Sequence, residues 1–584
     1  MKQQFTTIPF YKSYTMCKKA ALAVLLYIST AIVAKAQTTY LQLGTEDYNV
    51  LDRLETRSGQ LSNDLFLGVK PTQRKGMVKF LMQQADDSNS NNLSRIDKYN
   101  IAHAISTSGE WTDDENGAIN SKRPWFNTFY KKQADFVYVK TKDFFFSVNP
   151  VITGQLAYDK DNKRNPLFTS NRGVEVRGWI AKKLGFYTFF TDNQENVPAY
   201  VSQWIDTNHA VPGADFYIRR KNQPGYYDYL LARGYIDFAA VKDHINVTFG
   251  YDKNFIGDGM RSLFLSDFSA GATFLRLNTR VWKLNYENLF MELTPSFKLN
   301  GDKLQPHKYA TMHHLSVNAT KWLNVGAFET VIFDRVNRYE ASYLIPIILY
   351  RQTERALGSP DNVMLGINFK ALAAKHLQFY GQLILDEFTS KELVAGNGYW
   401  ANKFGVQLGG KYFDAFTVKN LDLQAELNVV RPFTYSHFDT VANYTHYNQA
   451  LAHPLGASFA EILAVARYQP VKNLFLTLKG MYYKKGADTS GTNFGNNIML
   501  DYDTRTTIPG EKRNYGYELI SGVKTQCATL SLNASYELRE NLFVDMGGTY
   551  RRFAWENGLY PTQNNMYMYG GFRLNFARRD YNFF

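Results

Sequence analysis

The feature that most constrains this chain is a period-two alternation of apolar and polar residues, which recurs beyond Asp135. The clearest runs are residues 421–429 and 529–538, where Leu, Ala, Val and Tyr alternate with Asp, Gln, Glu, Asn, Ser and Thr. Such a strand has one apolar face, which meets a second sheet in a soluble sandwich or lipid in a transmembrane barrel.

The links between these runs decide between the two architectures. Short links that carry Lys or Arg recur at 182–185, 241–244, 320–324, 373–376, 470–473 and 538–541. Long polar or aromatic links lie between them, at 196–227, 252–271, 336–361, 433–459 and 486–515. Strict alternation of short turns and long loops is typical of outer-membrane barrels. We therefore expect residues 131–584 to form an all-β transmembrane barrel of about 18 antiparallel strands.

A few positions depart from this pattern. Glu329 falls on the apolar side of the run 323–333. Asn149-Pro150 lies inside the first strand, where a proline removes a ladder donor and indicates a bulge or a rim position. His313-His314 is predicted to start a strand, with the two imidazoles facing opposite sides and binding no metal.

The N-terminus has the features of an export signal. Lys18 and Lys19 precede an apolar stretch from Ala20 to Val33, and the small-x-small triplet that ends at Ala36 follows. This order predicts a signal peptide, residues 1–36, cleaved near Ala36; Met16 is an alternative start. The full chain has a formal net charge of +13, and residues 1–36 contain five lysines and no acid, so the exported barrel has a net charge of +8. Such a barrel is expected to contact outer-membrane lipid, lipopolysaccharide or acidic polymers rather than nucleic acid.

Residues 37–130 have helical rather than strand periodicity. Thr45 is a candidate cap for a helix that ends at Gly59, and Pro71 suits the first turn of a second helix. A third helix is predicted from about Leu93, after a polar loop at 86–92. We expect a small α-helical subdomain on the periplasmic side of the barrel.

The sequence lacks the motifs of common enzyme classes. It has no His-Glu-x-x-His zinc motif, no P-loop and no Gly-x-Ser-x-Gly elbow. Beyond the signal, Cys527 is the sole cysteine, so no internal disulfide or Cys-based metal site is expected, and Cys527 is predicted to be a small strand residue. We expect a protein without catalytic activity, cofactor or metal.

Two long links carry the candidate binding residues. Tyrosine rings stack on sugar C–H surfaces, while His, Asn and Arg side chains bond hydroxyl or carboxylate groups. The candidate polysaccharide-binding residues are Asp258, Arg261 and Asp267 in the link 252–271, called the first link, and Tyr435, His437, Tyr444, His446, Tyr447 and His453 in the link 433–459, called the second link, together with Arg431 just before it. The alternative for the second link is a plug whose polar groups are satisfied internally. The inward aromatics Trp179, Tyr380 and Phe475 favour an occluded lumen over a diffusion porin.

Three segments resemble the Wzi capsule-assembly family of outer-membrane barrels. They are Leu51 to Gly59, residues 255–267, and residues 431–461 with Arg-Pro-Phe-Thr-Tyr-Ser-His and His-Pro-Leu-Gly. The resemblance implies a barrel of about eighteen strands over a periplasmic helical bundle, which holds capsular polysaccharide on the cell in a lectin-like manner. Relatives in gliding bacteria imply an alternative: an outer-membrane scaffold of a motility or secretion apparatus that binds partner proteins through the helical head.

Overall fold

The computed structural model describes residues 38–86, 93–112, 118–162, 166–219, 225–295, 305–335, 338–346, 349–358, 361–509, 511–558 and 560–581. The predicted signal peptide and all but the first residue of the predicted polar loop at 86–92 lie outside the described residues.

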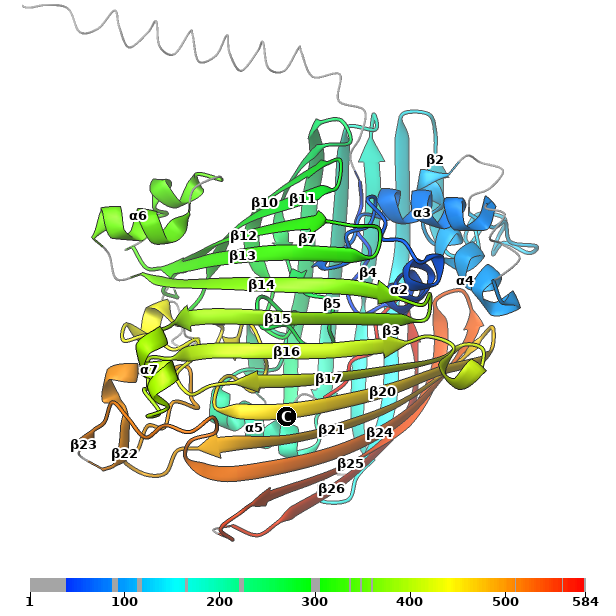
Figure 1. Ribbon diagram of the computed structural model, residues 1–584. Helices are drawn as coiled ribbons and strands as arrows, with labels where there is room; N and C mark the ends of the chain where they lie inside the picture. Colours follow the sequence, from blue (N-terminus) through cyan, green and yellow to red (C-terminus); the bar gives the residue numbers. More distant parts are fainter. Residues whose placement is uncertain are drawn as a thin grey trace, which may run out of the picture.

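Eighteen antiparallel strands of the described chain close into a barrel (Figure 1). They are β3 (Phe144–Asp159), β4 (Leu167–Ile180), β5 (Leu184–Asn196), β7 (Tyr226–Val241), β8 (Ile245–Asp252), β10 (Ala272–Val281), β11 (Leu284–Leu293), β12 (Lys308–Asn318), β13 (Leu323–Phe333), β14 (Asn362–Ala373), β15 (Leu377–Glu387), β16 (Lys403–Tyr412), β17 (Leu421–Val430), β20 (Phe459–Val471), β21 (Leu474–Ala487), β24 (Val523–Arg539), β25 (Leu542–Trp555) and β26 (Gln563–Leu574). Pairing of β26 with β3, from Leu574 opposite Ile152 to Tyr567 opposite Asp159, closes the ring. The predicted fold class is confirmed.

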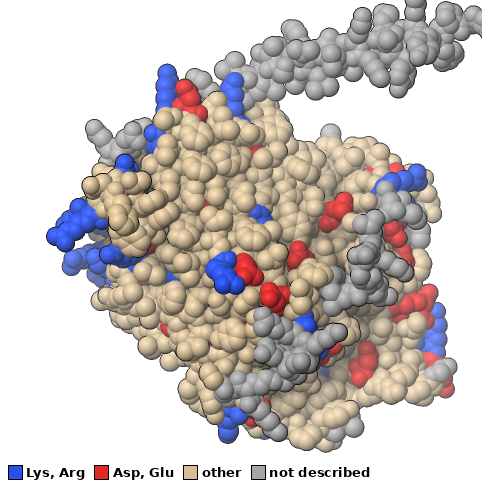
Figure 2. Space-filling view, turned by 180° about the vertical axis from the view of Figure 1, so that it is seen from behind, with Lys and Arg blue, Asp and Glu red and all other residues tan. Residues whose placement is uncertain are grey.

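The period-two alternation separates the wall from the lumen as predicted. Leu530 and Leu532 of β24 are 52% and 58% exposed on the outer wall, whereas Ser531 and Asn533 are buried on the inner side. Figure 2 shows a wall with few charged side chains, and Lys and Arg side chains gather near the edge at the left of that view. No helix in the described ranges is both long and apolar enough to cross a membrane.

The links alternate in length around the whole barrel. Short turns lie at the end that carries the N-terminal helices, and long loops with α5 (Ala199–Asn208), α6 (Tyr350–Leu357) and α7 (Ser390–Ala395) extend from the other end (Figure 1). In outer-membrane barrels the short turns are periplasmic and the long loops extracellular, which orients the molecule. The remaining short elements are β1 (Val69–Lys70), β2 (Val137–Lys140), β6 (Tyr217–Arg219), β9 (Phe255–Ile256), β18 (Thr445–His446), β19 (Gln449–Ala450), β22 (Thr506–Ile508) and β23 (Glu511–Lys512).

Pro150 produces no bulge, which was one of the two expected alternatives. It pairs with Val174 of β4 without any shift in register. On its other edge β3 pairs with β2 only up to Val148 and with β26 only from Ile152. The carbonyl of Pro150 accepts a bond from Asn575 on this second edge. The missing N–H of the proline therefore falls in the gap between β2 and β26, where no ladder bond is lost.

The N-terminal part forms a small helical head with its own core. It contains α2 (Asp47–Ser58), α3 (Arg74–Asp86) and α4 (Arg95–Ser106), joined by buried residues such as Leu51, Leu81 and Ile101. Gly59 ends α2 in the left-handed conformation, as predicted. The other boundaries differ: Glu46 rather than Thr45 precedes α2, and α3 begins three residues after Pro71. Ser94 caps α4 through a capping box with Asp97, which the sequence analysis did not identify.

The paired histidines lie in the middle of β12, not at its start. They face opposite sides, as expected: His314 contacts Asn368 in the lumen, whereas His313 lies on the outer face opposite Glu329 of β13. Both outer-face residues are nevertheless buried, at 7% and 6% exposure. The loop between β13 and β14 covers them, which explains how a carboxylate can lie on the apolar side of a strand.

Candidate functional site

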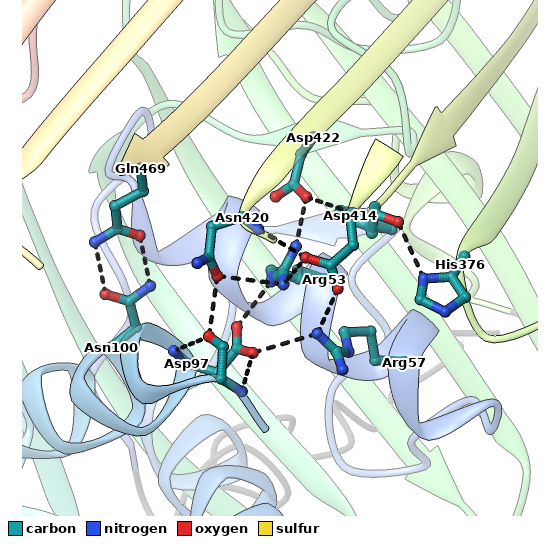
Figure 3. Close-up of polar contacts among 11 residues, drawn as sticks. Arg53, Arg57, Asp97, Asn100, His376, Asp414, Asn420, Asp422 and Gln469 are labelled. Atoms are coloured by element: carbon teal, nitrogen blue, oxygen red, sulfur yellow. Dashed lines mark hydrogen bonds and ion pairs between the residues drawn. The ribbon is translucent and has the colours of Figure 1, made fainter. Parts of the chain in front are cut away.

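Ion pairs close the periplasmic mouth of the barrel. Arg53 of α2 lies 2.8 Å from Asp97 of the head, and 2.5 Å from both Asp414 and Asp422 in the turn and strand that follow β16. Figure 3 shows this guanidinium surrounded by the three carboxylates, with Arg57 reaching Asp97 and Asp414 from the same helix. Charge-assisted bonds of this kind are strong when they are buried, so the head is bound to the barrel wall.

A second set of ion pairs joins α2 to lumen-facing lysines. Lys411 of β16 lies 2.6 Å from Asp52, and Lys370 of β14 lies 2.5 Å from Glu55. Burial alone would raise the pKa of Asp52, but the two lysines outweigh it and hold that pKa well below its ordinary value. The carboxylate thus remains charged, and α2 is held inside the mouth from two sides.

The link 252–271 enters the lumen from the extracellular end and meets the head. Its strand β9 pairs with β1, so that Val69 lies opposite Ile256, and the amide of Gly257 donates to the carbonyl of Gly68. Arg261 is 6% exposed and lies 3.0 Å from Glu461 of β20. The loop thus folds back into the barrel.

The link 431–458 packs onto the first link. The hydroxyl groups of Tyr435 and Tyr444 donate to the carbonyls of Leu263 and Phe264 at 2.8 and 2.7 Å. The two tyrosine rings stack with their centroids 5.6 Å apart, and each side chain is 1% exposed. The two tyrosines, both predicted site residues, therefore join the second link to the first link.

The histidines of the second link are also satisfied internally. His446 Nε2 donates to the Gly271 carbonyl at 2.8 Å and its Nδ1 accepts from the Thr294 amide; burial lowers the pKa of His446 to about 4. His453 Nε2 lies 2.7 Å from Glu461 with neither side chain exposed, and burial lowers the pKa of His453 too. The contacts of both imidazoles therefore favour the interpretation of the second link as a plug.

The other predicted site residues lie in four different places. Asp258 is buried 3.8 Å from Lys370 at the head, whereas Asp267 is exposed toward an internal cavity. Tyr447 is half-buried, with its amide bonded to Thr294. Arg431 and His437 lie at the outer side of the plug, where they meet neighbouring loops. The ten residues thus do not form one pocket, and polysaccharide binding by them stays a prediction.

A cavity of about 550 Å³ lies between the head and the plug. Its walls include α2, the first link, the segment 573–580 and lumen-facing residues such as Arg467 and Phe475. The aromatic residue Tyr380, predicted to face inward, is buried against Glu426 in the lumen.

Three extracellular loops meet in an aromatic platform that the sequence analysis missed. Its members are Tyr399 and Trp400 from the β15–β16 loop, Phe438 from the β17–β20 loop, and Tyr502 and Tyr515 from the β21–β24 loop. The ring centroids of Trp400 and Tyr502 lie 4.8 Å apart, and those of Tyr399 and Tyr515 lie 5.4 Å apart. Tyr515 is 49% exposed. Aromatic residues in the loop sequences were the available signal, but only the fold brings the three loops together.

Cations and two predicted site residues border the aromatic platform. Lys403 lies over the Tyr502 ring at 4.4 Å and Arg505 over the Trp400 ring at 4.0 Å. Arg431 donates to the carbonyls of Tyr399 and Tyr517, and His437 meets the Tyr502 ring edge-on at 5.8 Å. Lys403 and Arg505 are themselves buried and paired with Glu387 and Asp503, whereas no carboxylate pairs with Arg431 among the described residues. The platform therefore consists of aromatic rings over buried ion pairs, with Arg431 at its edge.

Comparison with solved structures agrees with this architecture. The Escherichia coli outer-membrane protein Wzi, described as a carbohydrate-binding β-barrel involved in group 1 capsule assembly, superposes with a TM-score of 0.55 at 11% identity, covering 93% of this chain and 100% of that chain. The chain of 584 residues thus has the fold of an outer-membrane β-barrel. OprD of Pseudomonas aeruginosa gives a TM-score of 0.40 at 12% identity over 74% of this chain and 95% of its own. No family model and no curated protein sequence matches the chain.

Proposed function

We propose that this protein binds and organises acidic polysaccharide at the cell surface, without catalysis. The observation that carries the proposal is the aromatic platform on a barrel whose lumen is filled from both ends. Ring faces stack on sugar rings, and the guanidinium of Arg431, which bonds carbonyls rather than carboxylates, attracts carboxylate groups on the polymer. The fold shared with Wzi, a carbohydrate-binding barrel, supports the same conclusion.

The plug and the platform have separate roles in this proposal. Polar side chains of the plug bond the loops to one another, and this keeps the extracellular surface rigid. These side chains are Tyr435, Tyr444, His446 and His453. A rigid site loses less conformational entropy when it binds a flexible polymer. Arg431 belongs to both, because its guanidinium joins the platform loops from the edge of the plug.

A glycan array on purified, detergent-folded protein tests the proposal. We expect binding to acidic polysaccharides, and at least tenfold weaker binding by the variant Tyr399→Ala/Tyr515→Ala, because stacking of each ring contributes about 0.5–1.5 kcal/mol. Tyr560→Ala is the matched control, since Tyr560 is an exposed tyrosine (58%) in the β25–β26 loop. Wild-type protein that is folded but binds no glycan contradicts the proposal.

The alternative is an interaction scaffold that docks motility or secretion proteins through the helical head. A specific feature favours it: the hairpin at 119–133 beside the head exposes Trp125 by 52% and Phe126 by 90%, next to exposed Lys122 and Arg123. Trp125→Ser/Phe126→Ser leaves the buried ion pairs of the head intact. If the scaffold is the main role, this variant loses the cellular phenotype while glycan binding is unchanged.

A further inference from the structure

The loop between β13 and β14 lies against the outer wall of the barrel rather than above it. Its described residues, 338–346 and 349–358, cover outward-facing side chains of β12, β13 and β14 at the extracellular end. Tyr339, Tyr343 and Tyr350 pack there on Tyr309, Val331, Phe333 and Val363, each of which is at most 8% exposed. The hydroxyl of Tyr286 on β11 also donates to the carbonyl of Pro346 at 2.5 Å.

The covering loop provides hydrogen-bond partners for the polar residues on the lipid side of the barrel. Tyr350 hydrogen-bonds His313, and the amide of Arg351 donates to Glu329 at 3.3 Å. In the ladder Glu329 lies directly opposite Leu365, which is 44% exposed on the same wall. An uncovered carboxylate at this position would face hydrocarbon and cost several kcal/mol. The edge of the loop therefore borders the lipid-facing wall.

The free surface of the loop is apolar where an aqueous loop would be polar. Residues 344–349 read Leu-Ile-Pro-Ile-Ile-Leu. Of these, Leu344, Ile345 and Leu349 are 44%, 47% and 66% exposed. In water these side chains would form an unfavourable apolar patch, whereas at the membrane boundary they continue the apolar wall of the barrel.

The same loop has four arginines and four carboxylates between residues 334 and 361, but two of the arginines are exposed and outside its ion pairs. Glu354 and Glu340 are each paired with an arginine, Arg351 and Arg335. Arg338 and Arg355 are exposed and have no ion-pair partner among the described residues. Exposed apolar side chains next to guanidinium groups are typical of segments that lie in an anionic lipid interface.

We propose that the β13–β14 loop binds an anionic, phosphorylated glycolipid of the outer leaflet. Leu344, Ile345 and Leu349 insert beside the acyl chains, and the guanidinium groups of Arg338 and Arg355 bind the phosphates. Guanidinium groups match phosphate oxygens in bidentate geometry. The site is independent of the aromatic platform, which is formed by other loops. A test of lipid binding therefore does not decide whether the proposed glycan binding is correct.

The first experiment titrates detergent-folded protein with diphosphorylated lipid A and, separately, with dephosphorylated lipid A. We expect the wild type to prefer the phosphorylated form, and Arg338→Ala/Arg355→Ala to lose at least tenfold in affinity for that form alone. Lys391→Ala is the control, because Lys391 is an exposed cation on α7. Equal affinity of the wild type for the two lipids, or an unchanged double variant, overturns the proposal.

The second experiment locates the apolar residues and does not depend on the charged ones. A nitroxide attached through Leu349→Cys in outer-membrane-like vesicles is expected to be accessible to oxygen and shielded from a water-soluble nickel complex. Lys391→Cys should give the opposite result, and the native Cys527 is buried. A nickel-accessible label at position 349 overturns the proposal as well.

Discussion

Arg53 of α2 and Asp414, in the turn after β16, lie 2.5 Å apart from Nη2 to Oδ1, although 361 residues separate them in the chain. Their side chains are only 5% and 9% exposed. The pair is part of the buried cluster in Figure 3 that joins the head to the barrel. The head is consequently a structural part of the periplasmic mouth, and its displacement would leave buried charges without partners.

Replacement of Arg53 should loosen the head. Arg53→Met leaves Asp97, Asp414 and Asp422 without their shared guanidinium, and breaking a buried pair costs about 3–5 kcal/mol. Trypsin digestion of detergent-folded protein should release head fragments much faster than in the wild type. Lys79→Met is the control, since its pair with Asp64 is exposed and contributes less than about 1 kcal/mol. Equal digestion of the two variants would count against an anchoring role.

Loss of one hydroxyl in the plug should mobilise the first link. Tyr435→Phe and Tyr444→Phe each remove a bond to a buried carbonyl of residue 263 or 264, at a cost of about 1–2 kcal/mol. Hydrogen exchange of residues 255–267 should accelerate by roughly tenfold in each variant. Tyr515→Phe, at an exposed ring, serves as the control. Unchanged exchange would show that the two hydroxyls do not hold the loops together.

The head should respond to alkaline pH through His103. Burial of this α4 imidazole opposes its protonation, but the hydrogen bond and charge of Glu537, 2.9 Å away, outweigh burial and raise the pKa of His103 to about 9. A raised pKa stabilises the folded state fully below the ordinary value of about 6.5, and this contribution is lost as pH rises through 9. NMR titration should give that pKa in the wild type and a value below 7 in Glu537→Gln. A pKa near 6.5 in the wild type contradicts the prediction.

The second link should seal the extracellular end of the barrel. Val430 and Phe459 pair at the ends of β17 and β20, so a short Gly-Ser turn can replace residues 433–456 without moving the strands. In planar bilayers the wild type should show no large steady current, whereas a variant that combines this deletion with Arg53→Met, which loosens the head at the other end, should conduct. A steady open current in the wild type would favour the porin interpretation instead.

Much of the fold was predictable because strand periodicity and link length are local properties. The runs at 421–429 and 529–538 each sort apolar from polar side chains by the pleat alone, and a barrel is the architecture that needs short and long links in strict alternation. Helix boundaries were less accurate: Pro71 precedes α3 instead of starting it, because Thr72 and Gln73 pair in extended conformation with Leu41 and Tyr40.

The candidate site was predictable only in part. The sequence indicated that residues 431–453 are rich in groups that bind sugars, and such groups serve equally well to bind neighbouring loops. Tyr435 and Tyr444 proved to be buried, whereas Arg431 and His437 reach the aromatic platform. Which use each side chain has depends on contacts with other loops, which lie from 32 to 180 residues away in the chain, and no local pattern encodes these.

The sequence by itself determined the barrel, its orientation and the presence of a helical head, since these follow from periodicity, turn length and capping. Only the tertiary structure decided that Arg53 closes the mouth, that Glu329 lies under a loop on the outer wall, and that three loops meet at Trp400 and Tyr502. The physical reason is that burial and ion pairing depend on which distant segments a closed sheet brings side by side.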